Sequence, residues 1–247
     1  MSSGEKEDVR ASLWSVWISI GKMIMDDVRD AVDVLRFTQL VVTNPNFISV
    51  LDAPRAASVS TEPEGGWAAE WQRFYHEVFD LEVDFTGLPL PAEQPGFGWV
   101  VMVAPGVSHN QAWAACKRRF GKGRTYSSAG DDLDRAVLTN DRSPAAAYAK
   151  RLRNRVSADE EMKNLSANAL QGQEVTGITL LERILLELWY EWKTGGGHLD
   201  LVTVTLCAGS RDRYGDVART NWIGNQFHVN FCHPDSALDE LRARVAV

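Results

Sequence analysis

The sequence has few cysteines and no long apolar run. Its three cysteines, Cys116, Cys207 and Cys232, are widely separated among 247 residues. An odd number of distant cysteines argues against a disulfide framework and against a zinc knuckle. No apolar run has the length of about 20 residues that a membrane-spanning helix needs. We therefore expect a protein that forms no disulfides and does not span a membrane.

The first residues lack the features of a secretory signal. Residues 1–8, Met-Ser-Ser-Gly-Glu-Lys-Glu-Asp, are acidic and polar, with neither a positively charged segment nor an apolar core. Both features are needed for recognition by the secretory machinery. This pattern, together with the few cysteines, predicts a cytoplasmic protein.

Positive charge is scarce as well. The chain carries 33 acidic and 26 basic residues, for a net charge of -7. Non-specific binding to nucleic acid depends on concentrated Lys and Arg, so this balance argues against it. A basic run at residues 117–124 (Lys-Arg-Arg-Phe-Gly-Lys-Gly-Arg) is more typical of a solvated helix end than of an anion site.

Apolar spacing and capping residues predict the helices. Residues 9–48 and 67–79 carry apolar residues at helical spacing. Ser108 and Thr179 are each followed three residues later by Gln or Glu, the pattern of a capping box. The second of these boxes opens the strongest predicted helix, residues 178–193. The next residues, 194–197, are rich in Gly, which is typical of a helix C-terminus. They lack the Lys-Ser/Thr of a phosphate loop.

Short apolar runs predict strands between and after these helices. The runs are residues 97–103, 135–138, 147–153, 202–206, 227–231 and 241–247. Together with the helices they predict an α+β fold, in which two helices pack on antiparallel strands. We place a domain boundary near residue 81. Residues 1–80 are then a mainly helical accessory region, and residues 81–247 a ligand-binding domain.

The last forty residues, 208–247, are the most informative part of the chain. Polar residues without any period alternate there with the predicted strands. Because alternate residues of a strand face opposite sides, Phe227 and Val229 are expected to point inward and His228 and Asn230 outward. A framework that carries side chains it does not need for folding is typical of a binding surface.

Several segments of this chain resemble a known group of proteins. They are residues 160–168 (Glu-Glu-Met-Lys-Asn-Leu-Ser-Ala-Asn), 177–183 (Gly-Ile-Thr-Leu-Leu-Glu-Arg) and 198–211, which ends in Cys-Ala-Gly-Ser-Arg. Together they resemble a family abundant in candidate-phyla bacteria. The C-terminal pattern, from Gly209-Ser210 through Pro234-Asp235 to residues 242–247, is similar to the variable region of diversity-generating retroelement target proteins. The resemblance covers roughly residues 80–247.

The resemblance implies a C-type-lectin-like domain of the formylglycine-generating-enzyme type. It also implies a non-enzymatic protein that binds an unidentified protein or other macromolecule through a diversified surface, without a cofactor, a catalytic residue or a metal site. In such families a reverse transcriptase miscopies template adenines. Asn codons thereby become codons for many residues, but not for Lys, Glu, Gln, Met or Trp. Gln226 and Glu240 depart from this rule.

The candidate ligand-binding residues are polar or otherwise irregular positions of the tail that this rule allows. Aromatic and Arg side chains contribute most at protein interfaces, which favours Tyr214 and the arginines among them. The candidates are Arg211, Asp212, Arg213, Tyr214, Asp216, Arg219, Asn221, Asn225, His228, Asn230, Cys232, His233, Ser236, Leu238 and Asp239.

Enzymatic interpretations remain as alternatives. In formylglycine-generating enzymes paired cysteines hold copper, for which Cys207 and Cys232 are the candidates here. His228, His233 and Asp235 with Cys232 suggest a metal site, although adjacent Cys232 and His233 cannot easily face one ion. Residues 159–161 (Asp-Glu-Glu) have no His or second carboxylate motif spaced to support acid-base catalysis, and they are expected to pair with a nearby arginine.

The other alternative is a nucleic-acid-associated defence component that binds through the basic run at residues 117–124.

Overall fold

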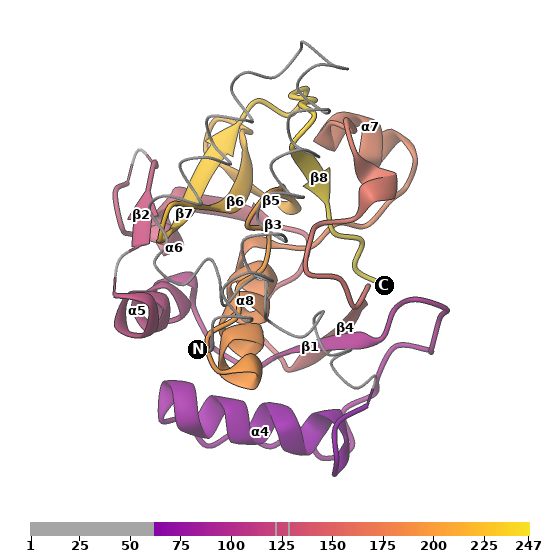
Figure 1. The fold of residues 1–247 in the computed structure, drawn as a ribbon, viewed down its shortest axis with the longest axis vertical. Helices are drawn as coiled ribbons and strands as arrows, with labels where there is room; N and C mark the ends of the chain where they lie inside the picture. Colours follow the sequence, from indigo (N-terminus) through magenta and orange to yellow (C-terminus); the bar gives the residue numbers. More distant parts are fainter. Residues whose placement is uncertain (1–61, 122, 128) are drawn as a thin grey trace, which may run out of the picture. The chain divides into compact units, whose positions relative to one another are not determined.

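The computed structural model describes residues 62–121, 123–127 and 129–247, which form a mixed α+β structure (Figure 1). The helix expected over residues 9–48 lies outside these residues. The helices are α4 (Gly66–Phe79), α5 (His109–Phe120), α6 (Leu133–Ala136), α7 (Ala167–Gly172) and α8 (Leu180–Thr194), with a 3-10 turn, η1 (Glu160–Met162). The strands are β1 (Trp99–Val103), β2 (Gly123–Thr125), β3 (Val137–Asn140), β4 (Tyr148–Leu152), β5 (Val204–Asp212), β6 (Val217–Ile223), β7 (Gln226–Cys232) and β8 (Leu241–Ala243).

The strands form two sheets. Strands β1 and β4 make an antiparallel pair, and the larger sheet has the order β2-β7-β6-β5-β3, with β8 attached to β5. The pairs β2–β7 and β5–β8 are parallel, so the larger sheet is mixed rather than antiparallel as expected. None of the described helices has the length and apolar character required to cross a lipid bilayer.

Most expected elements are present, with shifted bounds. Segment 135–138 was predicted as a strand, but α6 continues to Ala136 and β3 begins at Val137. The strand expected at 202–206 starts at Val204 and runs on to Asp212, and the sequence did not predict β6 at all. The strand expected over 241–247 ends at Ala243, although Val247 still exchanges backbone hydrogen bonds with Arg151 of β4.

Helix α8 is the central element of the described fold. Its predicted capping box is confirmed, since the Thr179 hydroxyl accepts from the Glu182 amide while the Glu182 carboxylate accepts from the Thr179 amide. Gly195 ends the helix in the left-handed conformation, with φ 69°. Helix α8 packs against β1 and α4 and also against β5 and β6 (Figure 1). It is therefore buried on more sides than the single apolar face that the sequence predicted.

Helix α4 belongs to the same core as α8. The Trp71 indole donates to the Val100 carbonyl at 2.8 Å, and the Tyr75 hydroxyl donates to the Met102 carbonyl at 3.0 Å. The rings of Trp71 and Trp189 stack with centroids 6.1 Å apart. From the sequence, this helix was expected to belong to the accessory region 1–80. In the structure, residues 66–79 instead pack with the domain that follows them.

A buried ionic cluster joins α8 to the C-terminal segment. Asp200 lies between Arg183 and Arg244, with nitrogen–oxygen distances of 2.8 and 2.7 Å, and Arg183 also pairs with Glu187 at 2.8 Å. The side chains of Arg183, Glu187 and Asp200 have no solvent exposure. Burial alone would raise the pKa of Asp200, but Arg244 and Arg183 hold it below its ordinary value. Asp200 therefore stays ionised and, together with Glu187, balances the charges of the two arginines.

We expect Asp200→Asn to destabilise the protein by about 3–5 kcal/mol, because it leaves buried Arg244 without a carboxylate among the described residues and Arg183 with Glu187 alone. Asn tolerates the left-handed backbone of this position, where φ is 55°, so the change is mainly one of charge. Urea unfolding at pH 7 measures the loss. Glu161→Gln, which breaks an exposed pair with Arg155, is the control and should cost at most about 1 kcal/mol. Equal losses in both variants would contradict the assigned role of Asp200.

A second prediction concerns the close approach of Gly177 to β5. A Cβ atom at Gly177 would lie 2.7 Å from the Cβ of Ala208, whereas one at Gly172 would meet no atom within 4 Å. Gly177→Ala should therefore cost about 1–3 kcal/mol through overpacking. Gly172→Ala should be neutral or stabilise by up to about 1 kcal/mol, because it reduces the entropy of the unfolded chain. Thermal and urea unfolding of the two variants make the comparison, and a harmless Gly177→Ala would show that the segment can shift.

Candidate ligand-binding surface

The hairpin of β6 and β7 has one apolar and one largely polar side. Residues directly opposite each other on antiparallel strands face the same side. Trp222 lies opposite Phe227, and both belong to the main core together with Val229. The pairs on the other side are Val217 with Cys232, Arg219 with Asn230, Asn221 with His228, and Ile223 with Gln226. The expected alternation in β7 is therefore present.

Among the described residues, α7 and the segments beside it cover only part of this outer side. A second apolar cluster lies there over β5 and β8, where Leu206 and Ala243 pack with Leu170 of α7. Beyond this cover, the outer side of β6, β7 and β2 carries mostly polar residues. We call this surface the polar face. Its members are Arg124, Tyr126, Arg219, Asn221, His228 and Asn230.

Strand β2 brings two residues to the polar face that the sequence analysis missed. Arg124 pairs with His228 in the parallel register of β2 and β7. The next outward residue, Tyr126, stacks on His228 with ring centroids 5.7 Å apart, and its hydroxyl accepts from Arg124 at 3.0 Å. About a hundred residues separate β2 from β7 in the sequence, so no local pattern links these side chains.

His228 is an exception to the predicted exposure of the tail. His228 lies on the outer side of the β6–β7 hairpin, as expected, but only 5% of its surface is exposed because the Tyr126 ring covers it. Its buried Nδ1 has no hydrogen-bond partner among the residues that the structure describes. Burial lowers the pKa of His228, and the nearby Arg124 lowers it further. The sequence predicted a solvent-exposed His228, and this was wrong.

The other fourteen candidate residues are all at least partly exposed. The exposed ones are Arg213, Tyr214, Asn225, His233, Leu238 and Asp239, and the half-buried ones are Arg211, Asp212, Asp216, Arg219, Asn221, Asn230, Cys232 and Ser236. They occupy the polar face, the β5–β6 and β6–β7 turns, and residues 233–239 after β7.

The β5–β6 turn holds two of the exposed candidates in a defined conformation. The Asp212 carboxylate accepts from the backbone amides of Tyr214 at 2.8 Å and of Asp216 at 2.9 Å. Gly215 takes the left-handed conformation that closes the turn, with φ 84°. Tyr214 is 71% exposed at the tip, and the Arg213 guanidinium lies 5.5 Å from its ring centroid. Asp212 therefore orders the turn, while Arg213 and Tyr214 are its contact residues.

Cys207 and Cys232 lie on opposite sides of the larger sheet. Cys207 pairs with Ala218 and belongs to the main core, whereas Cys232 pairs with Val217 and packs with the second cluster. Burial raises the pKa of both thiols. The described residues contain no group of three His, Cys, Asp or Glu that could hold a metal ion. The geometry therefore does not support a copper site shared by these two cysteines.

The basic run and the acidic run are mostly engaged within the protein. Lys117 pairs with Asp131 at 3.1 Å, and Arg118 donates to the Val78 carbonyl at 3.3 Å. Of the acidic residues, Glu161 pairs with Arg155 at 2.6 Å, which matches the structural role expected for it. The pKa of Glu161 is lowered to about 2, mainly by that arginine, so Glu161 is unsuited to acid-base catalysis near neutral pH.

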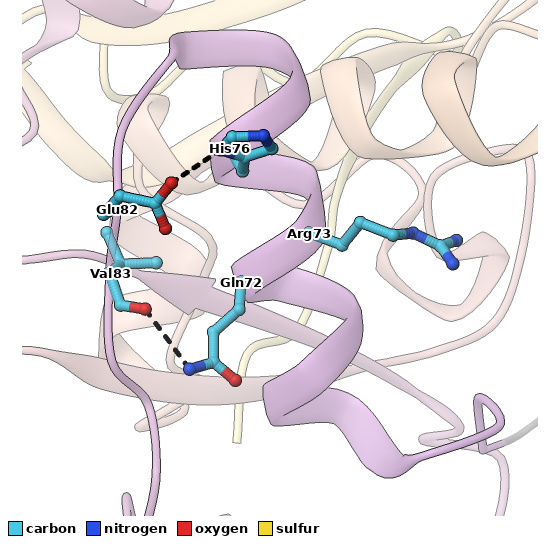
Figure 2. Close-up of a pocket in the computed structure, with 5 residues that line it drawn as sticks. All are labelled: Gln72, Arg73, His76, Glu82 and Val83. Atoms are coloured by element: carbon cyan, nitrogen blue, oxygen red, sulfur yellow. Dashed lines mark hydrogen bonds and ion pairs between the residues drawn. The ribbon is translucent and has the colours of Figure 1, made fainter.

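A hollow of about 340 Å³ lies away from these residues, between α4 and the chain that follows it. Figure 2 shows that His76 faces Glu82, with 2.7 Å between Nδ1 and Oε1, while Gln72 donates to the Val83 carbonyl at 3.2 Å. Arg73 extends away from the other labelled side chains (Figure 2). Arg73 pairs instead with Glu77 on the same helix, and none of the candidate residues lines the hollow.

The sequence matches no protein-family model, and comparisons with curated proteins and with solved structures found no significant match.

The buried His228 generates a prediction about pH. In the folded state its pKa lies below the ordinary value of 6.5, so the unfolded chain binds the proton more tightly. The stability contributed by neutral His228 is therefore complete above pH of about 6.5 and is lost as the pH falls toward the folded pKa. We expect His228→Phe to lose less stability than the wild type between pH 7 and pH 5. Urea unfolding at the two pH values measures this, and equal losses would contradict the burial of His228.

Proposed function

We propose that this chain is a non-enzymatic ligand-binding protein, the variable protein of a diversity-generating retroelement. In this proposal residues 81–247 form a C-type-lectin-like domain that works in the cytoplasm. The polar face, the β5–β6 turn and residues 233–239 form the ligand-binding surface, with residues 208–247 as its diversified part. The ligand is a protein or another macromolecule.

One observation carries this proposal. The two strands β6 and β7 build the core with one side, through Trp222, Phe227 and Val229, and present partly exposed polar side chains on the other. Substitution of an exposed side chain usually changes stability by no more than about 0.5 kcal/mol. A surface of this kind can change its residues without loss of the fold, which is what diversification requires.

The resemblance of the sequence segments supports the same function. The fold class is compatible with it, because a mixed sheet with helices packed on it matches the coarse architecture that the resemblance implies. The ordered β5–β6 turn adds a physical argument. Rigid loops that present Tyr and Arg bind with little loss of conformational entropy, and these residue types dominate protein interfaces.

The genomic DNA around the gene tests the proposal directly. We expect a near copy of the 3′ end of the gene that differs from it at template adenines and lies beside a reverse-transcriptase gene. Copies of the gene from related cells should differ mainly at the codons of the candidate residues. Differences spread evenly along the gene, or a stoichiometric copper ion bound by Cys207 or Cys232 of the purified protein, would contradict it.

The tolerance of the scaffold gives a prediction for the purified protein. We expect Arg219→Ala, Asn221→Ala and Asn230→Ala each to change the free energy of unfolding by at most about 1 kcal/mol, because none of these side chains packs in the core. Trp222→Ala, on the opposite side of the same strand, should cost about 3–5 kcal/mol. Urea unfolding measures all four variants. The proposal fails if the polar-face variants lose as much stability as the Trp222 variant.

A further inference from the structure

The polar face carries arginines but no acidic side chain. The outward residues of β2, β6 and β7 in the described structure are Arg124, Val217, Arg219, Asn221, Ile223, Gln226, His228, Asn230 and Cys232, and none of them is acidic. This contrasts with the whole chain, in which acidic residues exceed basic ones by seven. The local charge of the face is therefore opposite in sign to the net charge of the protein.

The two arginines of the polar face form no ion pair with a carboxylate, whereas most arginines of the described residues do. Nine arginines form an ion pair with a carboxylate: Arg73, Arg119, Arg142, Arg151, Arg153, Arg155, Arg183, Arg242 and Arg244. Within the described part of the chain, Arg124 and Arg219 have no such pair. Arg124 donates only to the Tyr126 hydroxyl, and Arg219 is half-buried opposite Asn230. A guanidinium has five N–H donors, so both have unused capacity for a carboxylate.

The register of the strands sets the distance between the two guanidinium-bearing residues. Arg124 is aligned with His228, and Arg219 with Asn230, two residues further along β7. Strand β7 lies between β2 and β6, so the two Cα atoms are two strand spacings apart across the sheet and two residues apart along it. Their separation is therefore about 12 Å. One carboxylate cannot bridge this separation symmetrically. Two acidic residues about four positions apart in an extended chain span the same length.

We infer that the polar face binds an acidic segment of a partner protein, with two carboxylates placed to pair with Arg124 and Arg219. This inference rests on the proposed function and names the class of ligand for the same surface. Asn221 and Asn230 lie beside the two arginines and offer amide groups to the backbone of such a segment. Tyr126 offers an exposed ring at the β2 end of the face.

A nucleic acid is a weaker fit to the same surface. Strong binding to a phosphate backbone usually draws on six or more basic contacts, and two arginines supply few of them. The basic run that precedes β2 adds little, because Lys117 and Arg119 are paired with Asp131 and Glu191. The net charge of -7 also repels a polyanion at long range, whereas a short acidic segment is attracted locally.

Selection of peptides on the full chain tests the inference. A random library of displayed 12-residue peptides is panned on the immobilised protein, and selected peptides are measured by fluorescence anisotropy. We expect enrichment of Asp and Glu over the input library. Arg124→Gln and Arg219→Gln should each weaken binding by about five- to tenfold, as expected for loss of one partly desolvated ion pair.

Arg135→Gln is the matched control, because Arg135 is exposed on α6, is not an outward residue of β2, β6 or β7, and forms no ion pair among the described residues. Its affinity should equal that of the wild type. If the selected peptides show no enrichment of Asp and Glu, but their binding is weakened by substitution of Asn221 or Asn230, this inference is overturned and the proposed function stays intact. Binders indifferent to every polar-face variant would overturn both. Failure to select any peptide, or arginine-dependent binding of a 20-nucleotide oligo(dT), would also overturn the inference.

Discussion

The pairing of Asp200 with both Arg183 and Arg244 is the constraint on which the described fold depends most. These three buried side chains come from α8, from the loop before β5 and from the segment after β8. The Asp200 carboxylate also accepts from the amide of Ala158 and from the hydroxyls of Thr203 and Thr205. A buried charge without such partners costs several kcal/mol, so the cluster requires these segments to meet in one arrangement.

This arrangement explains why a surface for recognition can exist on the larger sheet. The cluster, the aromatic core around Trp71 and Trp189, and α8 all lie on the inner side of β5, β6 and β7. Residues 160–175 cover the outer side of β5 and β8 through Leu170 and its neighbours, and this cluster extends to Val217 of β6 and Cys232 of β7. The energy of the fold is thus concentrated on one side of the sheet. The part of the outer side that no described residue covers can serve a ligand, and its arginines give it a local charge opposite in sign to the net charge of the chain.

Features encoded by neighbouring residues were predicted well from the sequence. Both capping boxes and the glycine end of α8 are present, because a cap depends on residues three or four positions apart. The alternation in β7 is also present, since it follows from strand geometry. Strand β6 was missed because Thr220 and Asn221 interrupt its apolar pattern. Helix α4 was assigned to the wrong region, because its Trp and Tyr contacts are with β1 and α8, far away in the sequence.

The sequence by itself determined the α+β class, helices α4, α5 and α8 with the capping boxes of the last two, and which tail residues are polar and mostly accessible, because spacing and composition act locally. Only the tertiary structure decided which of those residues share a surface. The parallel pairing of β2 with β7 brought Arg124 and Tyr126 beside the tail, and the Tyr126 ring buried His228. Strand pairing between distant segments depends on packing across the whole core, and no short stretch of sequence records it.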